Sequence, residues 1–355
     1  MDTLPLRVGI IGCGGITAFA HLPTLCRMPS HQVEVRCLCD TNIGRAETLK
    51  QRFNLQNAIC VQDYEKIVSD SSTDAIIVAS WPSNHAQIAI EAIESGKHVL
   101  IQKPLSLSDV SADKVLAASR ATTACILALP LIDAIRSFNR LRAVIDAGIL
   151  GSVRFARIRT TVIGPDDYYD DVLEFFQEPR DAVLPYFQAE YARKCGSIVD
   201  MGPYALTAFH YLFGPGKLLF SYRMPTDYDK SALLVLEIPR QDNFQIPQNE
   251  APYCSVEIGW QQVRGVEICS VFGSNGTACV EATGRLVVFG KDGKASVAHQ
   301  QDSLQPMLPA SPIRAQDLWV EAILSGKRKQ FRETVESAVW VSRIIDQVVP
   351  DTINQ

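Results

Sequence analysis

The fold is decided by the stretch Arg7–Leu22, which reads RVGIIGCGGITAFAHL. Its apolar start predicts a buried strand, the glycines that follow predict a tight turn, and the remainder is typical of a helix. Gly12 permits the turn, and Gly14 lets the backbone approach a pyrophosphate. The first amides of the helix, near Gly15 and Ile16, can bind that anion. The stretch therefore predicts a dinucleotide-binding site.

The residues around this turn refine the prediction. Thr17 stands where the usual third glycine would be, which loosens the packing of helix on strand, although its hydroxyl can still cap the helix. A second strand, VEVRCLCD, ends at Asp40, where a carboxylate would accept hydroxyls of the adenosine ribose. Asp40 repels a 2'-phosphate and no arginine follows it immediately, so NAD is predicted in preference to NADP. The alternative for Asp40 is a turn or cap residue.

Strand and helix patterns continue to alternate up to residue 128. This alternation predicts a doubly wound, parallel Rossmann sheet over residues 1–128, with its ligand at the carboxyl ends of the strands. Two polar stretches follow strands at that edge, SWPSNH and QKP. They add the following candidates for cofactor binding: Ser80, Trp81, His85, Gln102 and Lys103. For His85, contact with the cofactor and helix capping are equally good interpretations.

The second half of the chain, 129–355, has a different pattern. Strand-like runs separated by polar turns predict a large, mostly antiparallel open sheet, with GSNGT as a hairpin turn. Helical segments at 181–192 and 203–213 are expected to cover one face, and the other face is available to a partner subunit in a homodimer or homotetramer. Two final helices, with Trp319 and Trp340 in the core, are expected to pack back on the Rossmann domain.

Composition excludes several classes of protein. A chain of 355 residues that is 47% hydrophobic is expected to form two globular domains. The net charge of −5, without a long basic run, argues against nucleic-acid binding. The apolar runs are too short to span a membrane, and the ten cysteines lack zinc or dithiol spacing. With no signal-like start, a cytoplasmic protein without a metal site is expected.

Taken together, four motifs resemble the Gfo/Idh/MocA family of oxidoreductases. They are GIIGCGGI, the block SWPSNHAQIAIEAIESGKHVL, QKP in place of the family's E-K-P, and CGSIVDMGPYALTAFHYLFG, which is similar to its G-G-G-x-x-x-D-x-G-x-[HY] segment. The resemblance spans the first 215 residues. It implies a nicotinamide-dependent dehydrogenase or reductase that acts on sugars, cyclitols or related polyols.

The resemblance also implies the catalytic residues Lys103, Asp200 and Tyr204. Hydride transfer at an alcohol carbon requires a group that takes or gives the hydroxyl proton, and either Lys103 or Tyr204 could do so. The alternatives are a solvated lysine, an Asp200 that caps a helix, and a Tyr204 packed in the core. The family pattern implies a cis Lys-Pro bond. Gln102 replaces the family's glutamate, which leaves the positioning of Lys103 to be explained.

Two further features leave the function open. Leu131 and Ile132 stand where the family has polar residues, which predicts an apolar substrate face or the loss of sugar chemistry. The acidic, aromatic insert 163–181 could be a lid that places Tyr168 or Tyr169 near the substrate, or an exposed connector. A non-catalytic NAD-binding sensor or regulator is therefore an alternative to the enzyme. A lyase or hydrolase that oxidises its substrate transiently is a third possibility.

Overall fold

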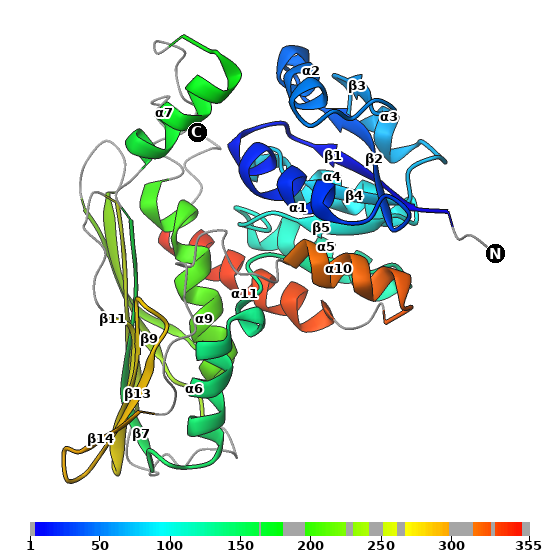
Figure 1. The fold of residues 1–355 in the computed structure, drawn as a ribbon. Helices are drawn as coiled ribbons and strands as arrows, with labels where there is room; N and C mark the ends of the chain where they lie inside the picture. The colour runs from blue at the N-terminus through cyan, green and yellow to red at the C-terminus, as the bar shows by residue number, and fades with distance from the viewer. Residues whose placement is uncertain are drawn as a thin grey trace. The chain divides into compact units, whose positions relative to one another are not determined.

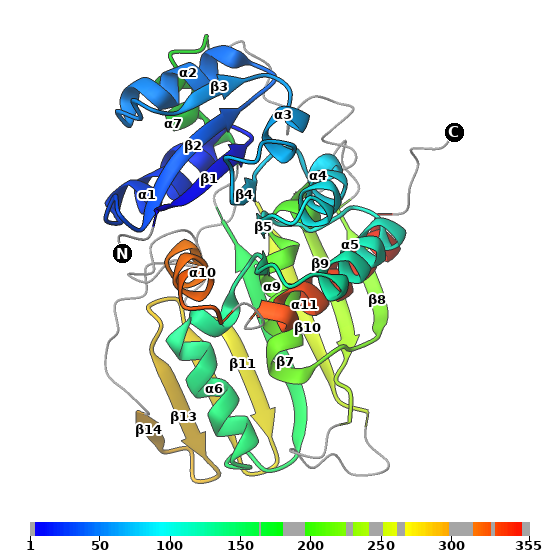
Figure 2. The ribbon, with the colours of Figure 1, turned by 90° about the vertical axis from the view of Figure 1, so that its right-hand side faces the viewer.

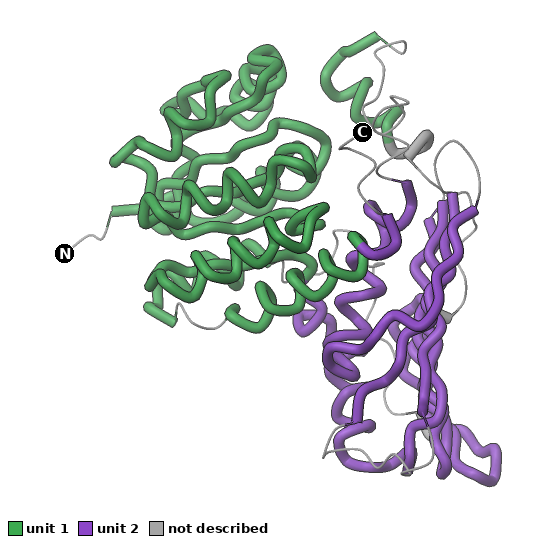
Figure 3. The backbone as a smooth tube through the Cα atoms, turned by 180° about the vertical axis from the view of Figure 1, so that it is seen from behind, with its two compact units in different colours: residues 1–130, 169–182, 313–346 green, residues 131–168, 183–312, 347–355 purple. Residues whose placement is uncertain are grey.

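The structure is a computed structural model, and it describes residues 4–162, 165–179, 196–224, 230–240, 251–260, 267–297, 315–327 and 331–349. The chain forms two compact units (Figure 3). Unit 1 comprises residues 1–130, 169–182 and 313–346, and unit 2 comprises residues 131–168, 183–312 and 347–355.

Unit 1 is built on a six-stranded parallel sheet with the strand order β3-β2-β1-β4-β5-β6. The strands are β1 (Leu6–Ile11), β2 (Val33–Cys39), β3 (Ile59–Val61), β4 (Ala75–Val78), β5 (His98–Ile101) and β6 (Ile126–Ala128). All four residues of β4 are buried, as expected for a central strand covered on both faces. The strand order reverses between β1 and β4, which places the ligand-binding crevice of such a sheet at their carboxyl ends.

Helices cover this sheet (Figure 1). They are η1 (Thr17–His21), α1 (Leu22–Arg27), α2 (Ile43–Arg52), α3 (Glu65–Val68), α4 (Pro82–Glu94), α5 (Asp109–Ala121), α10 (Ala315–Leu324) and α11 (Arg332–Val348). Unit 1 also includes α7 (Pro165–Phe176) from Tyr169 onward. Helices α4, α5 and α11 share one apolar cluster through Ala89, Val115 and Val339. Trp319 and Trp340 are 0% and 7% exposed, which confirms that both are core residues.

Unit 2 contains an eight-stranded sheet, ordered β14-β13-β12-β11-β7-β10-β9-β8. Its strands are β7 (Val153–Thr161), β8 (Leu218–Arg223), β9 (Ser231–Glu237), β10 (Tyr253–Gly259), β11 (Glu267–Gly273), β12 (Gly276–Glu281), β13 (Leu286–Gly290) and β14 (Ala295–Val297). All neighbours pair antiparallel except β7 and β10. Ser274 and Asn275 join β11 to β12, so the predicted open sheet and its hairpin turn are confirmed.

One face of the second sheet is covered by helices (Figure 2). Helix α9 (Gly202–Phe213) packs on β7 and β10, and α6 (Arg136–Asp146) packs on β12 and β13. The helix expected at 181–192 lies outside the described residues. Among the helices that are described, no segment combines the length and hydropathy that a membrane span requires.

Candidate functional site

The glycine turn that follows β1 has the geometry of an anion cradle. Gly12 has a φ of +102°, and a Cβ there would lie 2.2 Å from the carbonyl oxygen of Ala79. Only glycine fits this position, because the conformation and the neighbouring backbone both exclude a side chain. At Gly14 a Cβ would meet nothing within 4 Å among the described residues. Space is therefore open where a pyrophosphate would approach the backbone of the turn.

Asp40, which follows β2, is held against this turn. Its Oδ2 accepts the backbone N–H of Cys13 at 2.7 Å, and its Oδ1 accepts that of Asn42 at 2.8 Å. The N-cap of α2 is Asn42, whose side chain accepts from Gly44, so the interpretation of Asp40 as that helix's cap is wrong. Its contact with the N–H of Asn42, two positions on, is that of a turn residue, the other part of that alternative. Each carboxylate oxygen has a second lone pair, so Asp40 retains acceptor capacity for ribose hydroxyls.

The helix after the turn has two features that its sequence did not predict. The hydroxyl of Thr17 donates to the carbonyl oxygen of Gly12 at 2.6 Å, so it closes the turn and does not cap a helix. Residues Thr17–His21 form a π-helix, a form that frequently occurs at functional sites. His21, the last residue of this π-helix, is 0% exposed.

Lys103 lies two residues beyond the end of β5, at the same edge of the sheet, and is half-buried. The Lys103–Pro104 bond is cis, as the resemblance implied. The backbone N–H of Lys103 donates to Oε1 of the preceding Gln102 at 3.2 Å. The carbonyl oxygen of Pro104 contacts Nδ1 of His85 at 2.7 Å. The backbone of the lysine loop is therefore held on both sides of Lys103.

His85 joins two loops at this edge. Its Nε2 lies 2.9 Å from the carbonyl oxygen of Ser80, so the ring connects the loop after β4 to the loop after β5. Burial lowers the pKa of His85, and the carbonyl groups of Pro104 and Ser80 act in the opposite direction. The N-cap of α4 is Trp81, so the prediction that His85 could cap the helix is wrong.

The structure explains why Gln102 is compatible with this fold. The Nε2 atom of Gln102 lies 2.9 Å from Nε2 of His21, and the Nε2 atom of Gln316 lies 2.7 Å from Nδ1 of the same ring. Burial lowers the pKa of His21 to about 4, so the imidazole is neutral near pH 7. A neutral ring has one donor and one acceptor nitrogen, so one amide donates its N–H to the ring and the other turns its oxygen toward the ring N–H, and no charge is buried.

In unit 2, Asp200 has a partner that the sequence did not reveal. The indole N–H of Trp260, at the end of β10, donates to Oδ2 of Asp200 at 3.0 Å. The N-cap of α9 is Met201, so the interpretation of Asp200 as its cap is wrong. A Cβ at Gly202 would lie 3.1 Å from Cδ1 of Ile198, so a side chain there would crowd the turn that precedes α9.

The other predicted residues of this region have simple placements. Tyr204 is half-buried in the first turn of α9. Leu131 and Ile132 are 8% and 2% exposed, and η2 (Ile132–Ala134) packs against α9, so both belong to the core of unit 2. Tyr169 is buried, whereas the side chain of Tyr168 lies outside the described residues.

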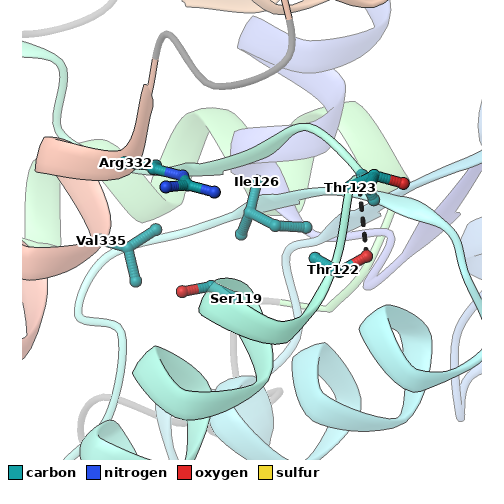
Figure 4. A pocket seen from close by; sticks show the side chains of 7 residues that line it. Ser119, Thr122, Thr123, Ile126, Arg332 and Val335 are labelled. Atoms are coloured by element: carbon teal, nitrogen blue, oxygen red, sulfur yellow. Dashed lines mark hydrogen bonds between the residues drawn. The ribbon is translucent and has the colours of Figure 1, made fainter.

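A shallow pocket of unit 1 lies at the opposite edge of the first sheet (Figure 4). Its lining includes Thr122 and Thr123, which precede β6, together with Arg332 and Val335 of α11. The amino end of β6 therefore carries this pocket, whereas Gly12, Asp40 and Lys103 follow the carboxyl ends of their strands. It is not part of the candidate cofactor site.

Fold and glycine turn together define a dinucleotide-binding Rossmann protein. Residues 6–128 match the sequence model described as the oxidoreductase family with an NAD-binding Rossmann fold. This finding confirms the resemblance inferred from the motifs.

The comparisons with individual proteins agree with the family. Inositol 2-dehydrogenase of Salmonella typhimurium is 26% identical over 149 residues, which are 42% of this chain and 44% of that enzyme. The chain thus covers less than half the length of this curated relative. A 3-ketoreductase from Actinomadura kijaniata, solved with NADP and TDP-benzene, has a TM-score of 0.72 at 21% identity and 97% coverage of both chains.

A second solved structure shows the same fold. An oxidoreductase from Agrobacterium radiobacter, in complex with NAD+, L-tartaric acid and magnesium, has a TM-score of 0.71 at 16% identity. The similarity covers 98% of this chain and 96% of that one. Both units therefore have counterparts among solved oxidoreductase structures.

Proposed function

We propose that this protein is an NAD-dependent oxidoreductase that transfers a hydride between nicotinamide and a secondary alcohol or ketone of a sugar, cyclitol or related cyclic polyol. The observation that carries the proposal is the open space over Gly14, next to a turn on which Asp40 is anchored through Cys13. The family of residues 6–128 and the inositol dehydrogenase and ketoreductase relatives support it.

The cofactor would be held by the residues at the carboxyl edge of the first sheet. The amides that begin with Gly14, Gly15 and Ile16 would bind the pyrophosphate, and Asp40 would accept the ribose hydroxyls. Ser80 and Trp81, together with Gln102 and Lys103, would form the nicotinamide end. Bound NAD would supply the hydride acceptor.

Lys103 and Tyr204 would handle the substrate's proton. An alcohol loses this proton as its carbon is oxidised, so the group that receives it needs a pKa near the working pH. Gln102 and His85 hold the backbone on either side of Lys103. Trp260 orients Asp200, which would hydrogen-bond the substrate beside the reacting carbon.

The proposal is tested by NAD reduction with a panel of sugars, cyclitols and dihydrodiols. We expect turnover with at least one of them and a loss of about a hundredfold or more in Lys103→Ala and in Tyr204→Phe. Lys114→Ala, which removes an exposed lysine from α5, is the matched control and should retain activity. Full activity of Lys103→Ala would overturn the catalytic assignment.

A second candidate is a non-catalytic NAD-binding sensor. Its supporting observation is that Gln102 and His21 form a neutral pair where the family has a charged acid. NAD binding that is unchanged in Lys103→Ala, with no turnover on the whole panel, would favour this candidate.

The open face of the second sheet supports a proposal of self-association. The ring centroid of Phe155 lies 5.0 Å from that of Tyr253 and 5.3 Å from that of Phe272. Tyr253 is 46% exposed. Exposed apolar surface of this kind is typical of a protein interface. We expect a second copy of the chain to cover it.

A further inference from the structure

An ion pair ties α7 to the helix that follows Asp40. Arg45, in the first turn of α2, donates from Nε to Oε1 of Glu178 at 2.6 Å and from Nη2 to Oε2 at 2.5 Å. The two side chains are only 21% and 18% exposed. Bidentate pairs of arginine and carboxylate are among the strong hydrogen-bonded interactions, and partial burial reduces their screening by salt.

Aromatic contacts hold the same segment in place. The ring of Phe175 lies 5.3 Å from that of Phe19, in the π-helix after the glycine turn. The guanidinium of Arg52 lies 4.3 Å from the centre of the Phe175 ring, and that of Arg45 lies 5.2 Å from the centre of the Phe176 ring. Helix α7 therefore packs beside α2 within unit 1 (Figure 2), although the chain reaches it only after β7.

This packing pairs Glu178 with an arginine that feels the charge of Asp40, the residue expected to bind the ribose. Asp40 contacts the glycine turn, and Arg45 is five positions after it in the sequence. The pKa of Arg45 is raised, first by its hydrogen bond to Glu178 and also by the charges of Glu178 and Asp40. The guanidinium thus lies in the electrostatic field of both carboxylates.

A 2'-phosphate on the adenosine ribose needs a cation, and an arginine near the acid at the end of the second strand commonly supplies it. Arg45 is suitably placed in the sequence for this task, but Glu178 occupies its hydrogen-bonding edge. A 2'-phosphate would have to compete with Glu178 for the guanidinium and would be repelled by two carboxylates.

We propose that Glu178 is a coenzyme-specificity residue, which selects NAD over NADP by neutralising and holding Arg45. The inference rests on the proposed function, because it assumes that a dinucleotide binds at the glycine turn. Part of the choice between NAD and NADP would then depend on a segment that lies far from the Rossmann strands in the sequence.

The test measures the dissociation constants of NADH and NADPH by cofactor fluorescence with the full-length chain. We expect Glu178→Gln to tighten NADPH binding by about tenfold while NADH binding changes by less than about threefold. Adding Arg45→Gln to this variant should abolish the gain, because the guanidinium is the group that is released. Glu174→Gln, an exposed glutamate of the same helix, is the matched control and should bind both cofactors as the parent chain does.

The possible failures are distinguishable. Normal NADH binding with an unchanged ratio of NADPH to NADH affinity in Glu178→Gln would overturn the role of Glu178 and leave the proposed function intact. Absence of binding of either cofactor to the parent chain would overturn both. Glu178→Ala provides the same test if the glutamine variant loses its fold, which circular dichroism will reveal.

Discussion

The side-chain nitrogen of Gln102 lies 2.9 Å from Nε2 of His21, and this contact joins the end of β5 to the helix that follows the glycine turn. The strands that lead to these two residues, β5 and β1, are separated in the sheet by β4. The pair therefore connects the lysine loop to the cofactor-binding turn across an intervening strand.

His21 makes stability depend on pH. Its pKa is lowered from 6.5 to about 4 by burial, so the unfolded chain binds more protons than the folded protein between these values. The free energy of unfolding therefore falls as the pH drops through this window, and His21 should account for about 2 kcal/mol of loss between about pH 7.5 and about pH 5. His21→Gln cannot titrate and should lack this contribution. Urea denaturation of both chains at both pH values measures it, and an identical pH dependence would contradict it.

Gly12 and Gly14 should respond differently to the same substitution. Gly12→Ala forces a Cβ to within 2.2 Å of the Ala79 carbonyl oxygen at a positive φ, so we expect a loss of stability of about 2 kcal/mol or more. The added methyl group of Gly14→Ala would lie in open space, so we expect this variant to be as stable as the parent chain. The same methyl group would obstruct the pyrophosphate and weaken NADH binding by about tenfold. Thermal unfolding and fluorescence titration measure the two effects. Unimpaired NADH binding by Gly14→Ala would count against the site.

The contact between Trp260 and Asp200 should be measurable as a coupling energy. Trp260→Phe keeps most of the ring volume but removes the N–H that donates to Oδ2 of Asp200. We expect Trp260→Phe to destabilise the fold by about 1–2 kcal/mol. In a double-mutant cycle with Asp200→Asn, the coupling should be about 1 kcal/mol or more, because the acceptor is charged. Additive effects in urea denaturation would show that the contact contributes nothing.

His85 should act as a positioning residue for Lys103. His85→Leu leaves the carbonyl oxygens of Ser80 and Pro104 without the imidazole and should lower stability by about 1–3 kcal/mol. Because the lysine loop loses a support, kcat should fall more than the affinity for NADH. His31→Leu, at an exposed histidine, is the control. Equal kinetics of the two variants would argue against a positioning role.

The open face of the second sheet should mediate self-association. Tyr253→Lys places a charge beside Phe155 on that face. We expect the parent chain to have the mass of a dimer or a larger assembly in light scattering, and the variant to shift toward the monomer because a buried charge is costly. Lys294→Glu, an exposed substitution near β14, should not change the mass. A monomeric parent chain would rule the interface out.

Much of the fold was predictable from short-range patterns. The buried runs of β1, β4 and β5 and the spacing of α5 follow from local periodicity, and the two-residue turn at Ser274 follows from turn chemistry. The π-helix at Thr17–His21 was not predictable, because its sequence fits an ordinary helix equally well. The alternative that Asp200 caps a helix was wrong for a related reason: the helical turn continues through it to Met201.

Several partners of the candidate site depend on contacts between distant segments. Trp260 follows Asp200 by 60 positions, and Glu178 follows Arg45 by 133 positions. Sequence spacing carries no signal for such pairs, since it reports only the residues that share one helix face or one strand. An arginine shortly after Asp40 was visible in the sequence, but its neutralisation by Glu178 was not.

The sequence by itself determined the class of the protein, because glycine torsion, strand periodicity and the charge at Asp40 act locally on the chain. Only the tertiary structure decided that Gln102 is matched to a neutral His21, that Asp200 is held by Trp260, and that Arg45 is paired with Glu178. The physical reason is that a buried polar group must find its partner wherever the fold brings one, whatever its distance along the chain.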